Sequence, residues 1–154
     1  MTSIDRNAGN ILKNKKILLV DDNQDDLALT IRAFNKLNFS EELMVANDGT
    51  EALEYLFGRN GKNGCPVEDM PLLVLLDLKM PKINGLEVLR EIKASQKTRL
   101  IPVVMFTSSC EERDIIASRE LGANEYIQKP VNFSNFTAVI RQLVCSMNLQ
   151  PISK

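Results

Sequence analysis

Short apolar runs alternate with longer amphipathic segments along the chain. Each run is bounded by turn-forming or charged residues, which is typical of a strand. Between the runs, apolar side chains recur every three or four residues, the spacing of one helix face. The predicted strands cover 16–20, 42–46, 72–77, 102–107 and 125–129. The predicted helices cover 27–37, 52–57, 86–92, 112–122 and 135–147. Gly122 is expected to end the fourth helix as a C-cap.

This alternation predicts a fold of the α/β class. Strands joined by helical crossovers lie parallel, and right-handed crossovers place helices on both faces of the sheet. Continuous apolar runs such as LLVLL at 72–76 fit strands that are buried on both faces. The sequence therefore predicts one doubly wound, five-stranded domain at 15–147, preceded by an N-terminal extension at 1–14 and followed by a C-terminal tail at 148–154. The stretch 58–71 is dense in Gly, Pro and Asn and is predicted to be an exposed loop.

The overall composition excludes several classes of function. With 19 basic and 20 acidic residues the net charge is -1, so the total charge does not favour nucleic acid or an anionic membrane as a partner. No apolar run approaches the length of a membrane span, and the N-terminus has no secretory signal pattern. We therefore expect a cytoplasmic protein.

The cysteine and histidine counts narrow the chemistry further. The chain has no histidine, which rules out imidazole acid–base catalysis and every Ser/His/Asp triad. Its 3 cysteines are widely spaced and odd in number, so we expect reduced thiols, with no zinc site and no fully paired disulfide framework. Any chemistry must use carboxylates, lysine, hydroxyls or a metal ion.

Polar residues occur at the carboxyl ends of four of the predicted strands. In an open parallel sheet the functional crevice lies at this edge, near the point where the strand order reverses. The residues that we expect to converge there are Asp21, Asp22, Asp77, Thr107, Ser108, Lys129 and Pro130.

Three neighbouring aspartates would repel one another unless they shared a cation. Because carboxylate oxygens are hard ligands, the predicted cation is Mg²⁺. A carboxylate beside Mg²⁺, a lysine and a hydroxyl can act as a nucleophile toward a phosphoryl group and form an acyl phosphate. Asp77 is the candidate nucleophile, with Lys129 and Thr107 contacting the phosphoryl oxygens.

Taken singly, these residues also have ordinary structural interpretations. Asp77 would be a turn or helix N-cap residue, and Asp21 or Asp22 would cap the first helix. Thr107 and Ser108 would be an N-cap pair for the fourth helix. Lys129 would be a surface lysine, and Tyr126 a plain core or surface aromatic residue.

Four separated motifs together resemble the receiver domain of two-component response regulators. They are DD at 21–22, LLDLKMPKINGLEVL around Asp77, FTSS at 106–109, and YIQKP at 126–130. Within that family the chain is most similar to single-domain regulators that serve phytochrome-type histidine kinases, which also tend to have an expanded loop before the third strand. The resemblance implies a flavodoxin-like (βα)5 fold with strand order 2-1-3-4-5.

The resemblance also implies a role for each matching residue. Asp77 is the implied phosphoacceptor, Asp22 a direct Mg²⁺ ligand, and Asp21 a ligand mainly through water. The backbone carbonyl of Lys79 is the implied third protein ligand, and Lys129 pairs with the phosphoryl oxygens.

Thr107 and Tyr126 resemble the family's switch pair, in which the hydroxyl moves toward the phosphoryl group and the ring turns inward. Pro130 stands where family members often have a cis bond and would help to aim the preceding lysine. Lys79 and Ser109 stand at positions that vary in the family and modulate phosphoryl lifetime. The Lys79 side chain could lie over the phosphoryl group, whereas the small Ser109 leaves the approach open.

The implied function is a signalling receiver that catalyses its own phosphorylation and dephosphorylation, with a sensor histidine kinase as partner and no DNA-binding output domain. The face made by the fourth helix, the fifth strand and the fifth helix is the candidate surface for homodimerisation or for a downstream phosphotransfer or effector protein. A phosphatase of the haloacid dehalogenase type is the alternative enzyme, but it needs a second aspartate at the position of Lys79. A binding module that works without phosphorylation is the third hypothesis.

Overall fold

The structure, a computed structural model, describes residues 16–39, 43–58, 64–130 and 132–147. The predicted extension at 1–14 and tail at 148–154 lie outside these residues, as does part of the predicted 58–71 loop. The described elements are β1 (Ile17–Val20), α2 (Gln24–Lys36), β2 (Leu43–Ala46), α3 (Gly49–Phe57), the 3-10 turn η2 (Val67–Asp69), β3 (Leu73–Leu76), α4 (Gly85–Ala94), β4 (Val103–Thr107), α5 (Glu112–Glu120), β5 (Glu125–Gln128) and α6 (Phe133–Ser146).

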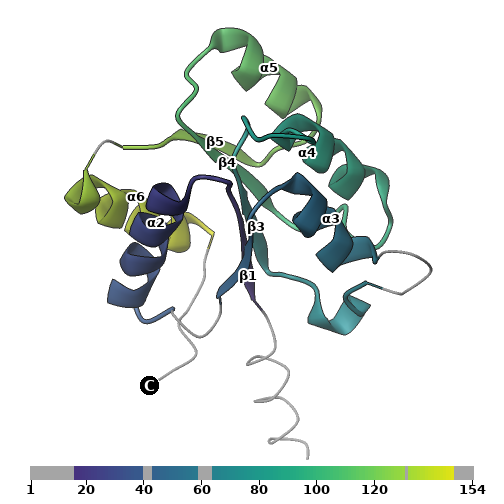
Figure 1. Ribbon diagram of the computed structural model, residues 1–154, viewed down its shortest axis with the longest axis horizontal. Helices are drawn as coiled ribbons and strands as arrows, with labels where there is room; N and C mark the ends of the chain where they lie inside the picture. Colours follow the sequence, from purple (N-terminus) through teal and green to yellow (C-terminus); the bar gives the residue numbers. More distant parts are fainter. Residues whose placement is uncertain (1–15, 40–42, 59–63, 131, 148–154) are drawn as a thin grey trace, which may run out of the picture.

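The strands form one parallel, five-stranded sheet in the order β2-β1-β3-β4-β5. Helices α2 and α6 pack on one face, while α3, α4 and α5 lie on the other (Figure 1). The α/β class, the doubly wound topology and the strand order predicted from the sequence are therefore confirmed. Each predicted strand lies within one or two residues of the observed one, and the fifth helix begins two residues earlier than predicted, at Phe133.

The three central strands are buried along their whole length, as their continuous apolar runs predict. Alternate side chains enter opposite cores: Leu18 and Val20 pack with α3 and α4, whereas Ile17 and Leu19 pack with α2 and α6. The edge strand β5 differs, because its first and last residues, Glu125 and Gln128, are exposed. The two-sided burial thus applies to β1, β3 and β4, and β5 is amphipathic.

The start of α2 settles the capping alternatives for the first acidic pair. Asn23 is the N-cap, and its side chain accepts a hydrogen bond from Asp26 N at 3.0 Å. Asp21 instead accepts a hydrogen bond from Asn23 N through Oδ1 at 3.0 Å. Neither Asp21 nor Asp22 caps the helix, so both carboxylates stay at the edge of the sheet.

The capping interpretations of the later residues are also wrong. Helix α4 is capped by Asn84, seven residues beyond Asp77, in a capping box with Glu87. The N-cap position of α5 is Glu111, whose side chain makes no capping hydrogen bond. Thr107 instead ends β4. Helix α5 stops where Gly122 was expected to end it, with Gly122 at φ 104° directly after the C-cap.

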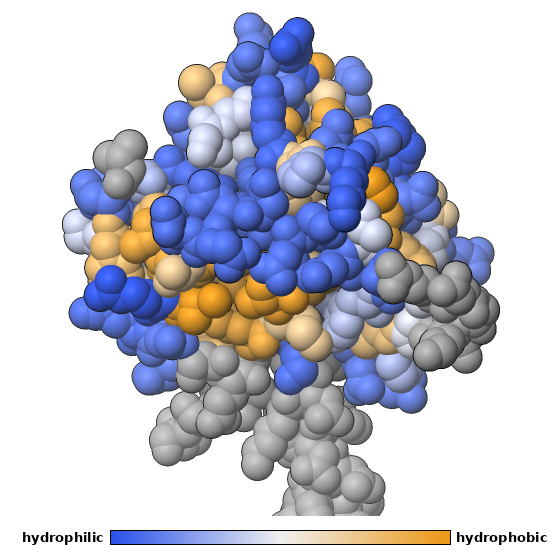
Figure 2. Space-filling view, in the orientation of Figure 1, coloured by the Kyte–Doolittle hydropathy of each residue, from blue (hydrophilic) through white to orange (hydrophobic). Residues whose placement is uncertain are grey.

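Hydrophilic side chains form a band across the middle of the face shown in Figure 2, above an area of hydrophobic side chains. In the same orientation, Figure 1 places the start of α2 and the carboxyl ends of the strands in the region of this band. None of the described helices combines the length and the hydrophobicity needed to cross a membrane.

Candidate functional site

The acidic cluster follows from the register of β1 and β3. Val20 pairs with Leu76 at the ends of these neighbouring strands, so the residues that follow them, Asp21 and Asp77, emerge side by side. Asp22 completes the group: one carboxylate oxygen from each of the three aspartates lies within 4.8 Å of the others. The expectation that these side chains converge at one edge of the sheet agrees with the structure.

Backbone contacts hold two of the aspartates and leave the third available. Asp77 is buried, its N–H donates to Val20 O at 2.9 Å, and its Oδ1 accepts from Leu78 N at 2.8 Å. Asp21 is also buried. Asp22 is exposed and makes no hydrogen bond or ion pair with the other described residues, so its oxygens are free to bind a ligand.

The turn after Asp77 depends on close backbone packing. Gly85 N donates to Leu78 O at 2.7 Å, which brings the start of α4 against the 77–78 backbone. A Cβ at Gly85 would overlap the carbonyl oxygen of Asp77 and lie 2.8 Å from Leu78 Cα. Only glycine therefore permits this approach, which fixes the backbone on which Asp77 is held.

Lys129 provides the positive charge of the site. Its Nζ lies 2.7 Å from Asp21 Oδ2, 2.8 Å from Asp26 Oδ2 and 3.5 Å from Asp77 Oδ2. Its backbone N–H donates to Thr107 O at 2.7 Å, which aligns the end of β5 with the end of β4. Burial opposes the charge of Lys129, but its hydrogen bonds to Asp21 and Asp26 and the charge of Asp77 raise the pKa of the lysine overall. The ammonium therefore stays protonated.

Asp26 was missed by the sequence reasoning. It lies in the first turn of α2, where acidic residues are common because they complement the helix dipole. The available signal was its position: a carboxylate in the first turn of a helix that starts at the same edge of the sheet as the predicted site. With Asp26 included, the Lys129 ammonium lies within 3.5 Å of three aspartates, Asp21, Asp26 and Asp77.

A cleft of about 700 Å³ opens over these groups, and its lining includes Asp22, Asp26, Asp77, Lys79, Thr107 and Lys129. Thr107 is buried at the base, where its Oγ1 accepts a hydrogen bond from Ser109 N at 3.3 Å. Ser108 is exposed on the lining. A nucleophilic carboxylate, an ammonium and a hydroxyl thus share one cleft.

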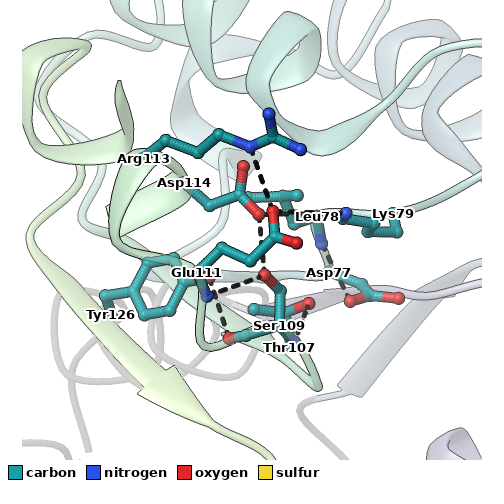
Figure 3. Close-up of polar contacts among 9 residues, drawn as sticks. All are labelled: Asp77, Leu78, Lys79, Thr107, Ser109, Glu111, Arg113, Asp114 and Tyr126. Carbon is teal, nitrogen blue, oxygen red and sulfur yellow. Dashed lines mark hydrogen bonds and ion pairs between the residues drawn. The ribbon is translucent and has the colours of Figure 1, made fainter. Parts of the chain in front are cut away.

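Figure 3 shows that Ser109, which lines the cleft, lies in a polar network with the start of α5 and Tyr126. The Ser109 hydroxyl donates to Asp114 Oδ2 at 2.7 Å, and the Ser109 carbonyl accepts from the hydroxyl of Tyr126 at 3.0 Å. The Lys79 ammonium lies 4.0 Å from Glu111 Oε1 and 3.9 Å from Asp114 Oδ2. Ser109 is hydrogen-bonded to Asp114, and Lys79 lies within 4.0 Å of Glu111 and Asp114. Both side chains therefore contact residues at the start of α5.

Two further switch-related positions can be placed. Tyr126 is half-buried on β5, and burial raises the pKa of its hydroxyl, with the Asp114 charge adding to the effect. The peptide bond between Lys129 and Pro130 is trans, because no described peptide bond is cis. The cis bond that is frequent at this position in the family is absent here; trans is the lower-energy form of most X–Pro bonds.

The acidic cluster suits a hard divalent cation. Burial raises the pKa of Asp21 to about 6, with the Asp77 charge adding to it, although hydrogen bonds from Lys129 and Asn23 oppose the shift. Lys129 alone therefore does not neutralise the site. The gathered donors are all carboxylate oxygens, the ligands that Mg²⁺ and Mn²⁺ prefer.

A five-stranded parallel sheet with an aspartate cluster and a lysine at its carboxyl edge is suited to binding a divalent cation and a phosphoryl group. The family profile described as "Response regulator receiver domain" matches residues 17–141, so the chain belongs to the response regulator receiver domain family.

Three similar proteins are response regulators, and two of them are described as phytochrome or bacteriophytochrome regulators. Response regulator Rcp1 of Synechocystis sp. is 37% identical over 127 residues, which cover 82% of this chain and 84% of Rcp1. The crystal structure of its Mn(2+)-bound form has a TM-score of 0.76 at 36% identity, covering 90% of this chain and 97% of that one.

The other two are known from solved structures. The phosphorylated cyanobacterial phytochrome response regulator RcpA has a TM-score of 0.72 at 36% identity, covering 84% of this chain and 91% of that one. The bacteriophytochrome response regulator RtBRR is 47% identical with a TM-score of 0.66, covering 84% of this chain and 77% of that one.

Family membership establishes the general class of activity. Receiver domains are signalling proteins that take part in their own phosphorylation and dephosphorylation, bind a divalent metal ion and interact with histidine kinases. The chain is homologous to single-domain phytochrome response regulators over most of its length.

Proposed function

We propose that Asp77 accepts a phosphoryl group from a histidine kinase in a Mg²⁺-dependent reaction, and that the chain signals through changed protein contacts. The observation that carries the proposal is the position of the Asp77 carboxylate, which shares one cleft with two further aspartates and lies 3.5 Å from the Lys129 ammonium. We assign the receiver domain to 15–147.

The transfer is a displacement at phosphorus. A carboxylate oxygen of Asp77 attacks the phosphorus of the kinase's phosphohistidine, a P–O bond forms, and the P–N bond breaks with its electron pair returning to the imidazole. The product is an acyl phosphate on Asp77. Hydrolysis reverses the state: water attacks phosphorus, the P–O bond to Asp77 breaks, and the carboxylate and inorganic phosphate are released.

The side chains around Asp77 have separate tasks in this step. Lys129 keeps its proton and pairs with the phosphoryl oxygens, and Pro130 fixes the end of β5 that carries it. Asp22 would be the direct metal ligand and Asp21 would bind mainly through water, since Lys129 and Asn23 already engage its oxygens, and Asp77 and the backbone carbonyl of Lys79 would complete the set. When bound, Mg²⁺ supplies positive charge that offsets the negative charge of the phosphoryl oxygens.

The readout begins at Thr107. Its hydroxyl turns toward the phosphoryl group, and Ser109 N then loses the acceptor that it has at 3.3 Å in the structure. Tyr126, which donates to the Ser109 carbonyl, turns inward as the loop moves. The face formed by α5, β5 and α6 changes its affinity for partners as a result. Lys79 and Ser109 modulate the lifetime of the phosphorylated state.

We further propose that the kinase is of the phytochrome type, because RcpA and RtBRR are described as phytochrome and bacteriophytochrome regulators. The α5–β5–α6 face is proposed to bind a second copy of the chain or a downstream protein. Ile116 on α5 is an exposed large hydrophobic side chain, whereas Ile127 and Val139 are partly buried beside the edge of β5 and Leu143 and Val144 are buried. The cytoplasmic location expected from the sequence remains a prediction.

The test is the intact mass of the protein after incubation with acetyl phosphate, with and without Mg²⁺. The wild type should gain one phosphoryl group only when Mg²⁺ is present, and Asp77→Asn should gain none. Asp25→Asn is the matched control, because Asp25 is an exposed acid in the first turn of α2 with no contact to another described residue. An adduct on Asp77→Asn, or none on the wild type at short times, would contradict the assignment.

A further inference from the structure

A third buried carboxylate among the described residues, Asp114, lies in the first turn of α5. We propose that Asp114 is a positioning residue that holds the loop between β4 and α5 in its resting arrangement, and that it thereby limits how long a phosphoryl group stays on Asp77. This inference rests on the proposed function of Asp77. Asp114 itself does not touch the reacting atoms.

Asp114 makes a contact that a helix-capping acid does not make. It is the third residue of α5, a position at which an acidic side chain ordinarily reaches back to the N-cap N–H, as Glu87 does in α4. Asp114 reaches past the N-cap and accepts the Ser109 hydroxyl at 2.7 Å. Its residue is only 8% exposed, so this charge-assisted hydrogen bond is largely shielded from water.

Ser109 connects this bond to both members of the switch pair (Figure 3). Its N–H donates to Thr107 Oγ1, its carbonyl accepts from the Tyr126 hydroxyl, and its hydroxyl donates to Asp114. The first two bonds are given up when Thr107 and Tyr126 move. The third ties Ser109 to α5 in the resting arrangement and is weakened when the loop moves, so Asp114 opposes the rearrangement.

Asp114 also attracts the Lys79 side chain. The Lys79 ammonium lies within 4.0 Å of two acids, Asp114 and Glu111, and Glu111 is shared with Arg113, whose Nε is 3.1 Å away. The described residues include no ion pair between Lys79 and Asp77. Since the Lys79 side chain is 59% exposed, its pairing is weak and readily exchanged. Without the Asp114 charge, Lys79 becomes available to the phosphoryl oxygens on Asp77.

Both effects act in the same direction. Losing Asp114 weakens the resting arrangement of the loop and frees a cation for the phosphorylated one, so the equilibrium shifts toward the phosphorylated conformation. At the lower end of its range, the net worth of a hydrogen bond to a charged group corresponds to about a tenfold change in an equilibrium constant. We expect Asp114→Ala to lengthen the half-life of the phosphoryl adduct by about that factor.

The experiment compares Asp114→Ala, Asp114→Asn and Ser109→Ala with the control Glu112→Gln. Glu112 lies in the same first turn of α5, is exposed and has no contact with another described residue, so Glu112→Gln removes the same charge without touching the loop. Decay of the adduct is followed by intact mass after acetyl phosphate is removed. The adduct should decay most slowly in Asp114→Ala. In Ser109→Ala its decay should be intermediate between those of Asp114→Ala and the wild type, because the charge near Lys79 remains. In Glu112→Gln it should decay at the wild-type rate.

The second readout does not require phosphorylation. The chain has 2 tyrosines, so a protein labelled with 3-fluorotyrosine gives two ¹⁹F resonances, and Tyr55→Phe assigns that of Tyr126. In unphosphorylated Asp114→Ala the Tyr126 resonance should shift, and in Asp114→Asn it should shift less because an amide oxygen can still accept the Ser109 hydroxyl. A purely structural role would lower thermal stability without moving this resonance or slowing the decay.

The outcomes separate the two proposals. If the wild type is phosphorylated but Asp114→Ala decays at the wild-type rate, or faster, the inference about Asp114 is overturned. If the wild type takes up no phosphoryl group, the proposed function fails. In that case an unchanged Tyr126 resonance in Asp114→Ala overturns the positioning role as well, and a shifted one supports it.

Discussion

Lowering the pH from 7.5 to 5.0 should weaken divalent-metal binding about tenfold through Asp21 alone. Metal ligation requires the ionised carboxylate, and burial raises the pKa of Asp21 from 3.8 to about 6. With that pKa, about 97% of Asp21 is ionised at pH 7.5 and about 9% at pH 5.0. An aspartate with the ordinary value would still be about 94% ionised at pH 5.0, so the difference isolates the effect of the buried site.

The assay is isothermal titration of the protein with Mg²⁺ across this pH range. At pH 6, buffers of different ionisation enthalpy should report the release of about half a proton for each metal ion bound, because Asp21 is then half protonated. Asp21→Asn should bind metal more weakly but with a nearly flat pH profile. A wild-type affinity that changes less than twofold between pH 7.5 and 5.0, or an equally steep profile in Asp21→Asn, would refute the reasoning.

The raised pKa of Asp21 also determines whether the metal-free protein becomes more or less stable as the pH changes. Between pH 3.8 and about 6 the folded chain binds a proton at Asp21 that the unfolded chain has released. The contribution of Asp21 to stability is therefore present below pH 3.8 and is lost as the pH rises through about 6. In the presence of a chelator this group should raise the melting temperature on acidification from pH 7 to 5, and Asp21→Asn should remove that part of the rise.

Three further substitutions test other contacts. Asp26→Asn removes one negative partner of Lys129, at 2.8 Å, and should weaken Mg²⁺ binding about twofold to fivefold in the same titration; an unchanged affinity would contradict the role of Asp26. Gly85→Ala places a Cβ against the backbone of Asp77 and should lower the unfolding free energy in urea by about 2–4 kcal/mol and abolish phosphorylation; wild-type behaviour would show that the turn can relax. Phe34→Ala removes a fully buried ring that packs edge-to-face on Phe39, so it should lower the unfolding free energy by about 3–5 kcal/mol, and a loss below about 1 kcal/mol would mean that the core refills.

The fold could be predicted from the sequence because strands that are buried on both faces consist of apolar residues. Strands β1, β3 and β4 are covered by helices on both faces, so every residue in them is apolar or small and the runs stand out. Convergence of Asp21, Asp22 and Asp77 followed from the same reasoning, since parallel strands end at one edge. Strand β5 is less apolar, since Glu125 and Gln128 at its ends are exposed, so its run gives a weaker signal than those of the central strands.

The rest of the site depends on where helical side chains point, which spacing alone does not give. Asp26 and Asp114 both lie in the first turn of a helix, where an acid is favourable whatever it touches. One of them contacts Lys129 and the other Ser109, residues far away along the chain or outside the helix. The engaged state of Ser109 was missed for the same reason, because it depends on Asp114 and Tyr126.

The segment 125–129 combines buried and exposed side chains within one short stretch. In the proposed function, buried Lys129 and half-buried Tyr126 carry the reaction and its readout, while Glu125 and Gln128 are exposed and make no side-chain hydrogen bond or ion pair with the described residues. Substitutions at Glu125 and Gln128 can therefore change which proteins bind at this edge of the sheet without altering Lys129 or Tyr126. Related regulators can in this way bind different partner proteins while they keep the same phosphoryl chemistry.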